Sequence, residues 1–218
     1  MENQLSLSEK LLLLAIRPQK GGIAPFSFSI DLVIAGASIL EMELTGNVRI
    51  AEGRAETTGL QTNHPLHLYM LSGMIRANKP RKIERWLTSR RLSMRKVKGD
   101  VFQSLVRKKE IRLEERRFLF FRWKRPYLHP GNHSGQVIDQ AKRLINQPSG
   151  NEEDLYFLML LDPAGLLRRI YPERGMRKAA LRKIRQLREN NLNAGAVAKA
   201  LAVVKAIQRV QAARRAAT

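Results

Sequence analysis

The chain has 218 residues, with 40 Lys and Arg against 19 Asp and Glu, so its formal net charge is +21 at pH 7. Charge of one sign on this scale opposes compact folding and therefore indicates a polyanionic partner, an anionic membrane or a nucleic acid. The absence of cysteine excludes disulfides, zinc fingers, iron–sulfur centres and thiol catalysis, and it suits a reducing cytoplasm.

The N-terminal region predicts two buried helices. Ser6 and Glu9 have the spacing of a capping box, which starts a helix over residues 8–16. Residues 31–44 are apolar nearly all round, which is typical of a buried helix. Further along the chain we expect short strands at 48–51 and 59–62, a helix opened by Pro65 and ended by Pro80, and helices at 83–88 and 96–108.

The second half predicts one more hairpin and a run of helices. Residues 111–113 and 118–122 are expected to pair over a turn at 114–117, followed by helices at about 135–146, 152–161, 164–171, 176–189 and 193–215. Neither a repeat nor a long linker interrupts the chain. The expected fold is mainly α, a single globular helical domain over residues 1–218 with one or two small β-hairpins. Residues from about 205 to 218 are expected to form a frayed helix end.

The sequence gives no support for catalysis, a metal site or a cofactor. His64 and His67 flank Pro65, and His129 and His133 lie in a loop-like stretch, so neither pair predicts a metal site. Phosphate-loop, dinucleotide-binding and nucleophile-elbow motifs are all missing. The apolar stretch at 32–44 is shorter than the roughly 20 residues that a membrane span needs, so a membrane role would be peripheral.

Three stretches concentrate the cations: residues 76–98, 107–125 and 168–188. Near an anionic membrane each basic residue can contribute about 1 kcal/mol of attraction. Within the second stretch, residues 118–123 add a run of apolar and aromatic side chains, FLFFRW. This run is interpreted either as a strand that covers the core or as an exposed tip that contacts lipid or another subunit. Four residues are candidates for that contact: Phe121, Trp123, Lys124 and Arg125.

The same segment supports a rival interpretation. A helix at 96–108 followed by a basic hairpin resembles a winged helix-turn-helix, in which residues 96–125 would contact DNA. Charge alone does not separate this DNA-binding alternative from a membrane role. RNA is a third hypothesis, although the few aromatic residues provide no evident base-stacking platform.

The order of several segments resembles the Golgi phosphoprotein 3 family. Residues 11–16 (LLLLAI), 20–23 (KGGI) and 35–48 (AGASILEMELTGNV) correspond to its "LLLLAL" helix, "KG" turn and "GLAGALLLELALRGRI" helix–strand unit. Residues 83–87 (IERWL) and 105–111 (LVRKKEI) continue the series. Without a long N-terminal extension, the chain is most similar to the short, prokaryotic-type members.

This resemblance implies a mostly helical domain that binds membranes through phosphatidylinositol 4-phosphate, without catalysis. Position by position, the family's pocket tryptophan corresponds to Phe26, one pocket arginine to Ala35, and two further arginines to Arg95 and Lys98. Arg95 and Lys98 are three residues apart and can share one helix face. The loss of arginine at Ala35 favours looser binding of anionic or phosphorylated headgroups.

The expected function is therefore that of a cytoplasmic, peripherally membrane-associated protein. Its headgroup site would consist of Phe26, Arg95 and Lys98. Its main partner would be an anionic lipid with a phosphoinositide-like headgroup. Binding of membrane-protein clients and formation of a homo-oligomer are two further possibilities. Nucleic acid ranks below the membrane as a partner.

Overall fold

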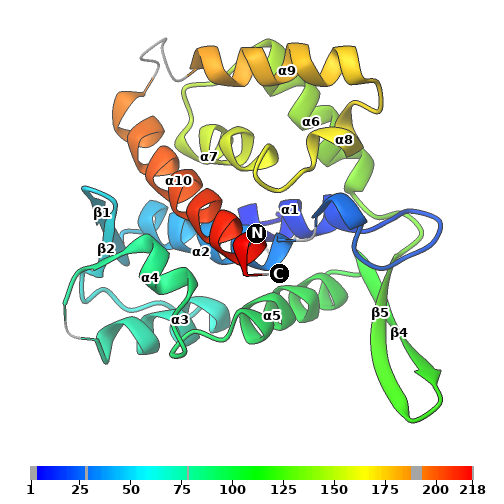
Figure 1. The fold of residues 1–218 in the computed structure, drawn as a ribbon, viewed down its shortest axis with the longest axis horizontal. Helices are drawn as coiled ribbons and strands as arrows, with labels where there is room; N and C mark the ends of the chain where they lie inside the picture. The colour runs from blue at the N-terminus through cyan, green and yellow to red at the C-terminus, as the bar shows by residue number, and fades with distance from the viewer. Residues whose placement is uncertain (1–3, 28, 78, 188–192, 218) are drawn as a thin grey trace.

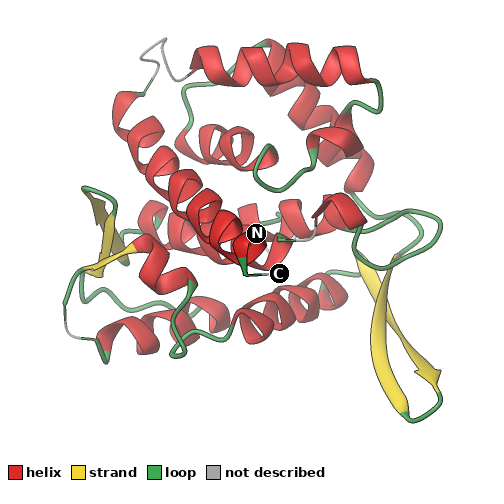
Figure 2. Ribbon diagram, in the orientation of Figure 1, coloured by secondary structure: helices red, strands yellow, loops and turns green. Residues whose placement is uncertain are grey.

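The fold, a computed structural model, is mainly α-helical, as the sequence predicts (Figures 1 and 2). The structure describes residues 4–27, 29–77, 79–187 and 193–217. Its helices are α1 (Leu7–Ala15), α2 (Ile30–Leu44), α3 (Pro65–Ile75), α4 (Ile83–Leu87), α5 (Met94–Arg107), α6 (Ser134–Asn146), α7 (Glu152–Leu161), α8 (Leu167–Ile170), α9 (Arg174–Leu187) and α10 (Ala194–Ala216), with a 3-10 turn η1 (Pro25–Ser27). Its strands are β1 (Val48–Ala51), β2 (Arg54–Thr57), β3 (Arg81–Lys82), β4 (Ile111–Phe118) and β5 (Phe121–Leu128).

Helices α1 and α2 form the centre of the core. Every residue of α1 is buried, and so are most residues of α2. The predicted capping box is confirmed: the Ser6 hydroxyl accepts from the backbone N–H of Glu9, and the Glu9 carboxylate accepts from the backbone N–H of Ser6. The other helices surround this pair, with α3, α4 and α5 on one side and α6 to α9 on the other (Figure 1).

Helix α10 crosses the molecule and closes the core. It packs against α7, α4 and α2, and its C-terminal end lies near the centre of the view in Figure 1. The Gln211 amide donates to the carbonyl oxygen of Pro163 (3.0 Å), and Arg214 forms an ion pair with Asp31 (3.2 Å). Fraying beyond residue 205 stays a prediction, although the helix is continuous to Ala216.

The first predicted hairpin is partly wrong. Strand β1 is confirmed, but its partner is β2 at Arg54–Thr57 rather than residues 59–62. Glu52 and Gly53 both have positive φ, 50° and 71°, which is the backbone twist that a two-residue hairpin turn needs. The turn therefore comes immediately after β1, and the fully buried Ala55 faces the core. A short third strand, β3, pairs with β2.

The second hairpin is longer than predicted, and its turn lies elsewhere. Residues 114–117 were expected to form the turn, but they lie within β4, which pairs with β5 from Ile111↔Leu128 to Phe118↔Phe121. The connection is Leu119 and Phe120, with Leu119 in the left-handed region at φ 52°. The long hairpin projects away from the helices (Figure 1), so its outer half lacks a core-facing side, and the charged residues 114–117 fit there as strand.

Candidate functional site

The projecting hairpin, residues 111–128, is called the arm below. It carries six cationic and two acidic side chains. Directly opposed residues of an antiparallel pair share a face. The register therefore places Trp123 opposite Arg116 and Arg125 opposite Glu114 on one face, and Lys124 opposite Glu115 on the other. The arm thus presents cations on both faces.

The tip of the arm is apolar and exposed. Leu119 is 67% exposed, Phe120 94% and Trp123 45%. The interpretation of residues 118–123 as a strand that covers the core is therefore wrong for these three residues. Among the predicted contact residues, Lys124 is exposed and Arg125 half-buried. The side chain of Phe121 lies outside the part of the chain that the structure describes.

The base of the arm is fixed to the helical body. Gly22 donates its backbone N–H to the carbonyl oxygen of Pro126 (2.7 Å). At Gly21, where φ is 62°, an added Cβ would lie 2.6 Å from the Tyr127 ring, so the close contact requires glycine. The Tyr127 hydroxyl in turn accepts from Arg116 (2.7 Å). The arm is therefore held at its base while its tip projects.

The two cations predicted to hold phosphate lie on α5. Arg95 is exposed and Lys98 half-buried, and neither forms a hydrogen bond or ion pair with another residue that the structure describes. The neighbouring Lys96 pairs instead with Asp100 (3.2 Å). Both predicted residues are thus available to an external anion.

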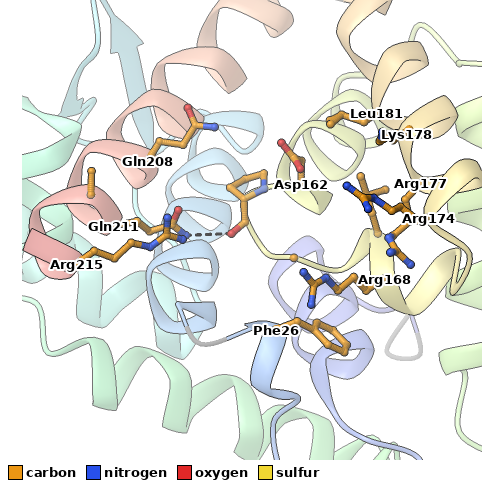
Figure 3. A pocket seen from close by; sticks show the side chains of 14 residues that line it. Phe26, Asp162, Arg168, Arg174, Arg177, Lys178, Leu181, Gln208, Gln211 and Arg215 are labelled. Carbon is orange, nitrogen blue, oxygen red and sulfur yellow. Dashed lines mark hydrogen bonds between the residues drawn. The ribbon is translucent and has the colours of Figure 1, made fainter. Parts of the chain in front are cut away.

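Phe26 lines a cavity of about 740 Å³ that we call the α8–α10 cavity (Figure 3). Its described lining includes neither Arg95 nor Lys98. Ala35, which replaces the expected arginine, is buried in α2. The cations that share the cavity with Phe26 are Arg168, Arg174, Arg177, Lys178 and Arg215.

Sequence reasoning missed these cavity cations as partners of Phe26. It grouped four of them within the charged stretch 168–188, and Arg215 lies outside that stretch. Their proximity to Phe26 depends on how η1, α8, α9 and α10 pack, and a linear pattern does not contain that information.

A buried polar cluster joins α1, α2 and α3. The Glu41 carboxylate accepts from the backbone N–H of Ser8 (2.6 Å), from the Ser8 hydroxyl (3.3 Å) and from His67 Nε2 (3.2 Å). Burial raises the pKa of this carboxyl, but the hydrogen bond and charge of His67 and the N–H of Ser8 outweigh it, so the net pKa is lowered. Because the Ser8 hydroxyl contacts Glu41 rather than His67, the cluster does not form a serine–histidine nucleophile pair.

A family profile matches most of the chain. The profile described as Golgi phosphoprotein 3 (GPP34) covers residues 7–204. The chain belongs to the Golgi phosphoprotein 3 family. The resemblance inferred from the ordered segments is thereby confirmed. A search of curated proteins finds no significant match to the chain.

The family match covers some of the elements described above and not others. The matched residues include the arm, Phe26, Arg95 and Lys98. The end of α10 that lines the cavity, from Gln208 to Arg215, lies beyond residue 204. Across the described ranges of this Golgi phosphoprotein 3 family member, the helices lack the combination of length and apolar character that a membrane span requires. Within the same ranges, the His, Asp and Glu side chains form no group of three that could hold a metal ion.

Proposed function

We propose that this protein is a peripheral membrane protein that binds anionic lipid headgroups through basic surfaces, without catalysis. The observation that carries the proposal is the arm, whose tip exposes Leu119 and Phe120 beside cationic residues. The free energy falls when apolar side chains leave water for the membrane interface, while neighbouring cations stay at the headgroup phosphates. Membership in a family of lipid-binding adaptors supports the same function.

The finer assignment concerns the headgroup. Arg95 and Lys98 would hold a lipid phosphate from α5, and Phe26 would provide an aromatic wall for a phosphoinositide-like headgroup. The aromatic residues Phe121 and Trp123, with Lys124 and Arg125, would contact the membrane or a second subunit. The protein would then act at the cytoplasmic side of a membrane, where membrane-protein clients could bind it.

Vesicle flotation tests the proposal. Vesicles of phosphatidylcholine alone are compared with vesicles that contain phosphatidylserine, at low and high NaCl. We expect binding only with the anionic lipid, and weaker binding at high salt because the charges are screened. Leu119→Asn with Phe120→Ser should reduce binding at least tenfold, since each fully buried apolar side chain contributes about 1.5–3 kcal/mol.

A matched control removes two exposed apolar side chains from another place. Leu68 and Ile75 of α3 are 50% and 59% exposed, so Leu68→Gln with Ile75→Gln removes exposed apolar surface without changing the arm. This control should bind vesicles like the wild type. Equal loss in both variants would refute the role of the arm, and flotation that ignores anionic lipid would refute binding through anionic headgroups. Unchanged binding after Arg95→Ala with Lys98→Ala would remove these two residues from the headgroup site.

The DNA-binding alternative is tested in the same experiment by a gel shift with duplex DNA at both salt concentrations. Sequence-preferring binding to DNA together with failure to bind vesicles would favour the winged-helix interpretation of residues 96–125.

A further inference from the structure

The α8–α10 cavity is built from three parts of the chain that are far apart in sequence. Phe26 comes from η1, Arg168 and its neighbours from the loop after α7 through α9, and Gln208 to Arg215 from the end of α10. Figure 3 shows the arginines of α8 and α9 on one side, Arg215 on the opposite side and Phe26 below them. The cavity has a volume of about 740 Å³, which lies within the range of small-molecule sites.

Local contacts hold the cavity in shape. Gln211 of α10 donates to the carbonyl oxygen of Pro163, which fixes the helix end to the loop after α7. Arg177 donates to the carbonyl oxygens of Tyr171 and Pro172, which fixes the start of α9. Gly165 has φ 69°, and an added Cβ would lie 2.2 Å from the Phe26 carbonyl oxygen, so only glycine permits this approach. The described contacts thus preform the cavity before any ligand enters.

The cavity is strongly cationic. Five cationic side chains line it, against one carboxylate, Asp162, among the described lining residues. The side chains of Arg168, Arg174 and Lys178 form no hydrogen bond or ion pair with other residues that the structure describes. Like charges held near one another repel, and the attraction of each cation to a shared anion would offset this repulsion.

A second, smaller cavity gives independent support. It has a volume of about 210 Å³ and also contacts Phe26 and Arg168, so it adjoins the first. Arg169 lines it, and the Nε of Arg169 is buried without a hydrogen-bond acceptor among the described residues. Burial lowers the pKa of this guanidinium, so an anion placed nearby would stabilise its charged form.

The lining indicates the class of ligand. Arginine presents a planar set of donors that matches phosphate oxygens, and several arginines together favour a group with more than one negative charge. Phe26 and Leu181 add apolar surface that could contact a ring, while Gln208 offers an amide. A phosphate ester of headgroup size fits both the charge and the volume.

We propose that the α8–α10 cavity is a binding site for a multiply charged phosphate ester, held mainly by Arg168, Arg174 and Lys178 beside Phe26. This inference deepens the proposed function and rests on it only for the membrane source of the ligand. Arg95 and Lys98 on α5 would then form a separate basic contact.

Calorimetric titration with soluble probes tests the site without a membrane. The probes are inositol 1,4-bisphosphate and inorganic pyrophosphate, with uncharged inositol as the negative control. The wild type should bind both phosphate probes, and Arg168→Gln with Arg174→Gln should weaken binding at least tenfold. The matched control is Arg182→Gln with Arg185→Gln, which removes the same charge from exposed positions of α9 that do not line the cavity. It should change binding less than twofold.

A second variant tests the cavity without removing any cation. Ala212 is exposed and lines the cavity, so Ala212→Glu would place a carboxylate among the arginines and should abolish probe binding. Equal loss in the cavity pair and the α9 control pair would overturn the site, because binding would then follow net charge alone. The site would also be overturned if the wild type bound neither soluble probe. If the wild type still floated with anionic vesicles in that case, the proposed function would remain.

The two phosphate sources are distinguished by comparison. A lipid headgroup is supported if two results are found together. The wild type binds inositol bisphosphate more tightly than pyrophosphate, and Arg168→Gln with Arg174→Gln no longer floats with vesicles that contain phosphatidylinositol 4-phosphate. Equal affinity for both probes, with flotation unchanged, supports a phosphate-binding site for a soluble ligand.

Discussion

Glu41 is a buried charge whose partners come from two neighbouring helices. Its carboxylate is 8% exposed and accepts from Ser8 at the start of α1 and from His67 in α3. Removing a buried carboxylate from water is costly unless hydrogen bonds replace the lost solvation. These contacts make the carboxylate part of the packing between α1, α2 and α3.

The lowered pKa of Glu41 predicts a specific pH dependence of stability. Because the folded pKa lies below the ordinary value of 4.5, the charged form stabilises the fold above that value. This contribution is lost as the pH falls through the folded pKa. Glu41→Gln should lower the free energy of unfolding by roughly 1–3 kcal/mol at pH 7, and the difference from the wild type should shrink below about pH 4.

Denaturant unfolding of both proteins at several pH values between neutral and acid measures this difference. The control is Glu115→Gln, at an exposed position of the arm, which should change stability by less than about 0.5 kcal/mol at any pH. A difference for Glu41→Gln that stays constant down to acid pH would show that the carboxylate charge does not contribute to folding.

At the level of elements, the crossing of α2 and α10 depends on one glycine. A Cβ added at Gly36 would lie 2.8 Å from Val203 Cγ1 and 2.9 Å from Ile207 Cδ1. Both neighbours are fully buried, and Val203 is β-branched and therefore stiff in a helix. The absence of a side chain at Gly36 thus allows the two helices to approach closely.

Two Gly→Ala substitutions should have opposite effects. Gly99→Ala in α5 meets no atom within 4 Å, so it should stabilise the protein by about 0.5–1 kcal/mol through helix propensity. Gly36→Ala has the same propensity gain but overpacks the crossing, which typically costs about 1–3 kcal/mol. We expect a net loss, measured as a lower midpoint of thermal unfolding.

Val203→Ala provides the test of mechanism. It removes one of the two methyl groups that the new Cβ would meet, Val203 Cγ1, so Gly36→Ala should cost less in its presence, with a coupling of at least about 0.5 kcal/mol. Additive effects of the two substitutions would show that the loss in Gly36→Ala comes from somewhere other than this contact.

The helices could be predicted from the sequence because their signals are local. The capping box of Ser6 and Glu9 lies within one turn, and Pro65 marks the start of α3 directly. The arm could not be placed as well. Residues 114–117 are all charged and were interpreted as a turn, yet an exposed strand without a buried side has no apolar alternation to reveal it. The true turn uses Leu119 at positive φ, which no turn-residue preference indicates.

At the scale of the whole molecule, the family could be predicted from the sequence, but the cavity could not. Phe26 and Arg215 are separated by almost the full chain, yet both line it. Their proximity results from α10 crossing the molecule and from the loop at Pro163 that Gln211 holds. Because these are long-range packing contacts, a single sequence gives no signal for them.

The charge balance predicts how salt affects folding. With 40 cations and 19 acids, at least 21 cations lack an acidic partner of their own, and they repel one another in the compact state. Raising NaCl from about 0.01 M to about 0.15 M shortens the Debye length from about 30 Å to about 8 Å. The midpoint of thermal unfolding should therefore rise by a few degrees, since about 1 kcal/mol shifts it by about 2–4 °C in a chain of this size.

A variant with fewer unpaired cations should show a smaller salt effect. Replacing Arg122 and Lys124 of the arm and Arg182 and Arg185 of α9 by Gln changes four exposed positions and lowers the net charge from +21 to about +17. Its midpoint at low salt should exceed that of the wild type, and the two should converge as NaCl screens the remaining charges. A wild-type midpoint that falls with NaCl would mean that ion pairs such as Lys10–Glu153 outweigh the repulsion, so the surplus cations would carry no cost that a bound polyanion could relieve.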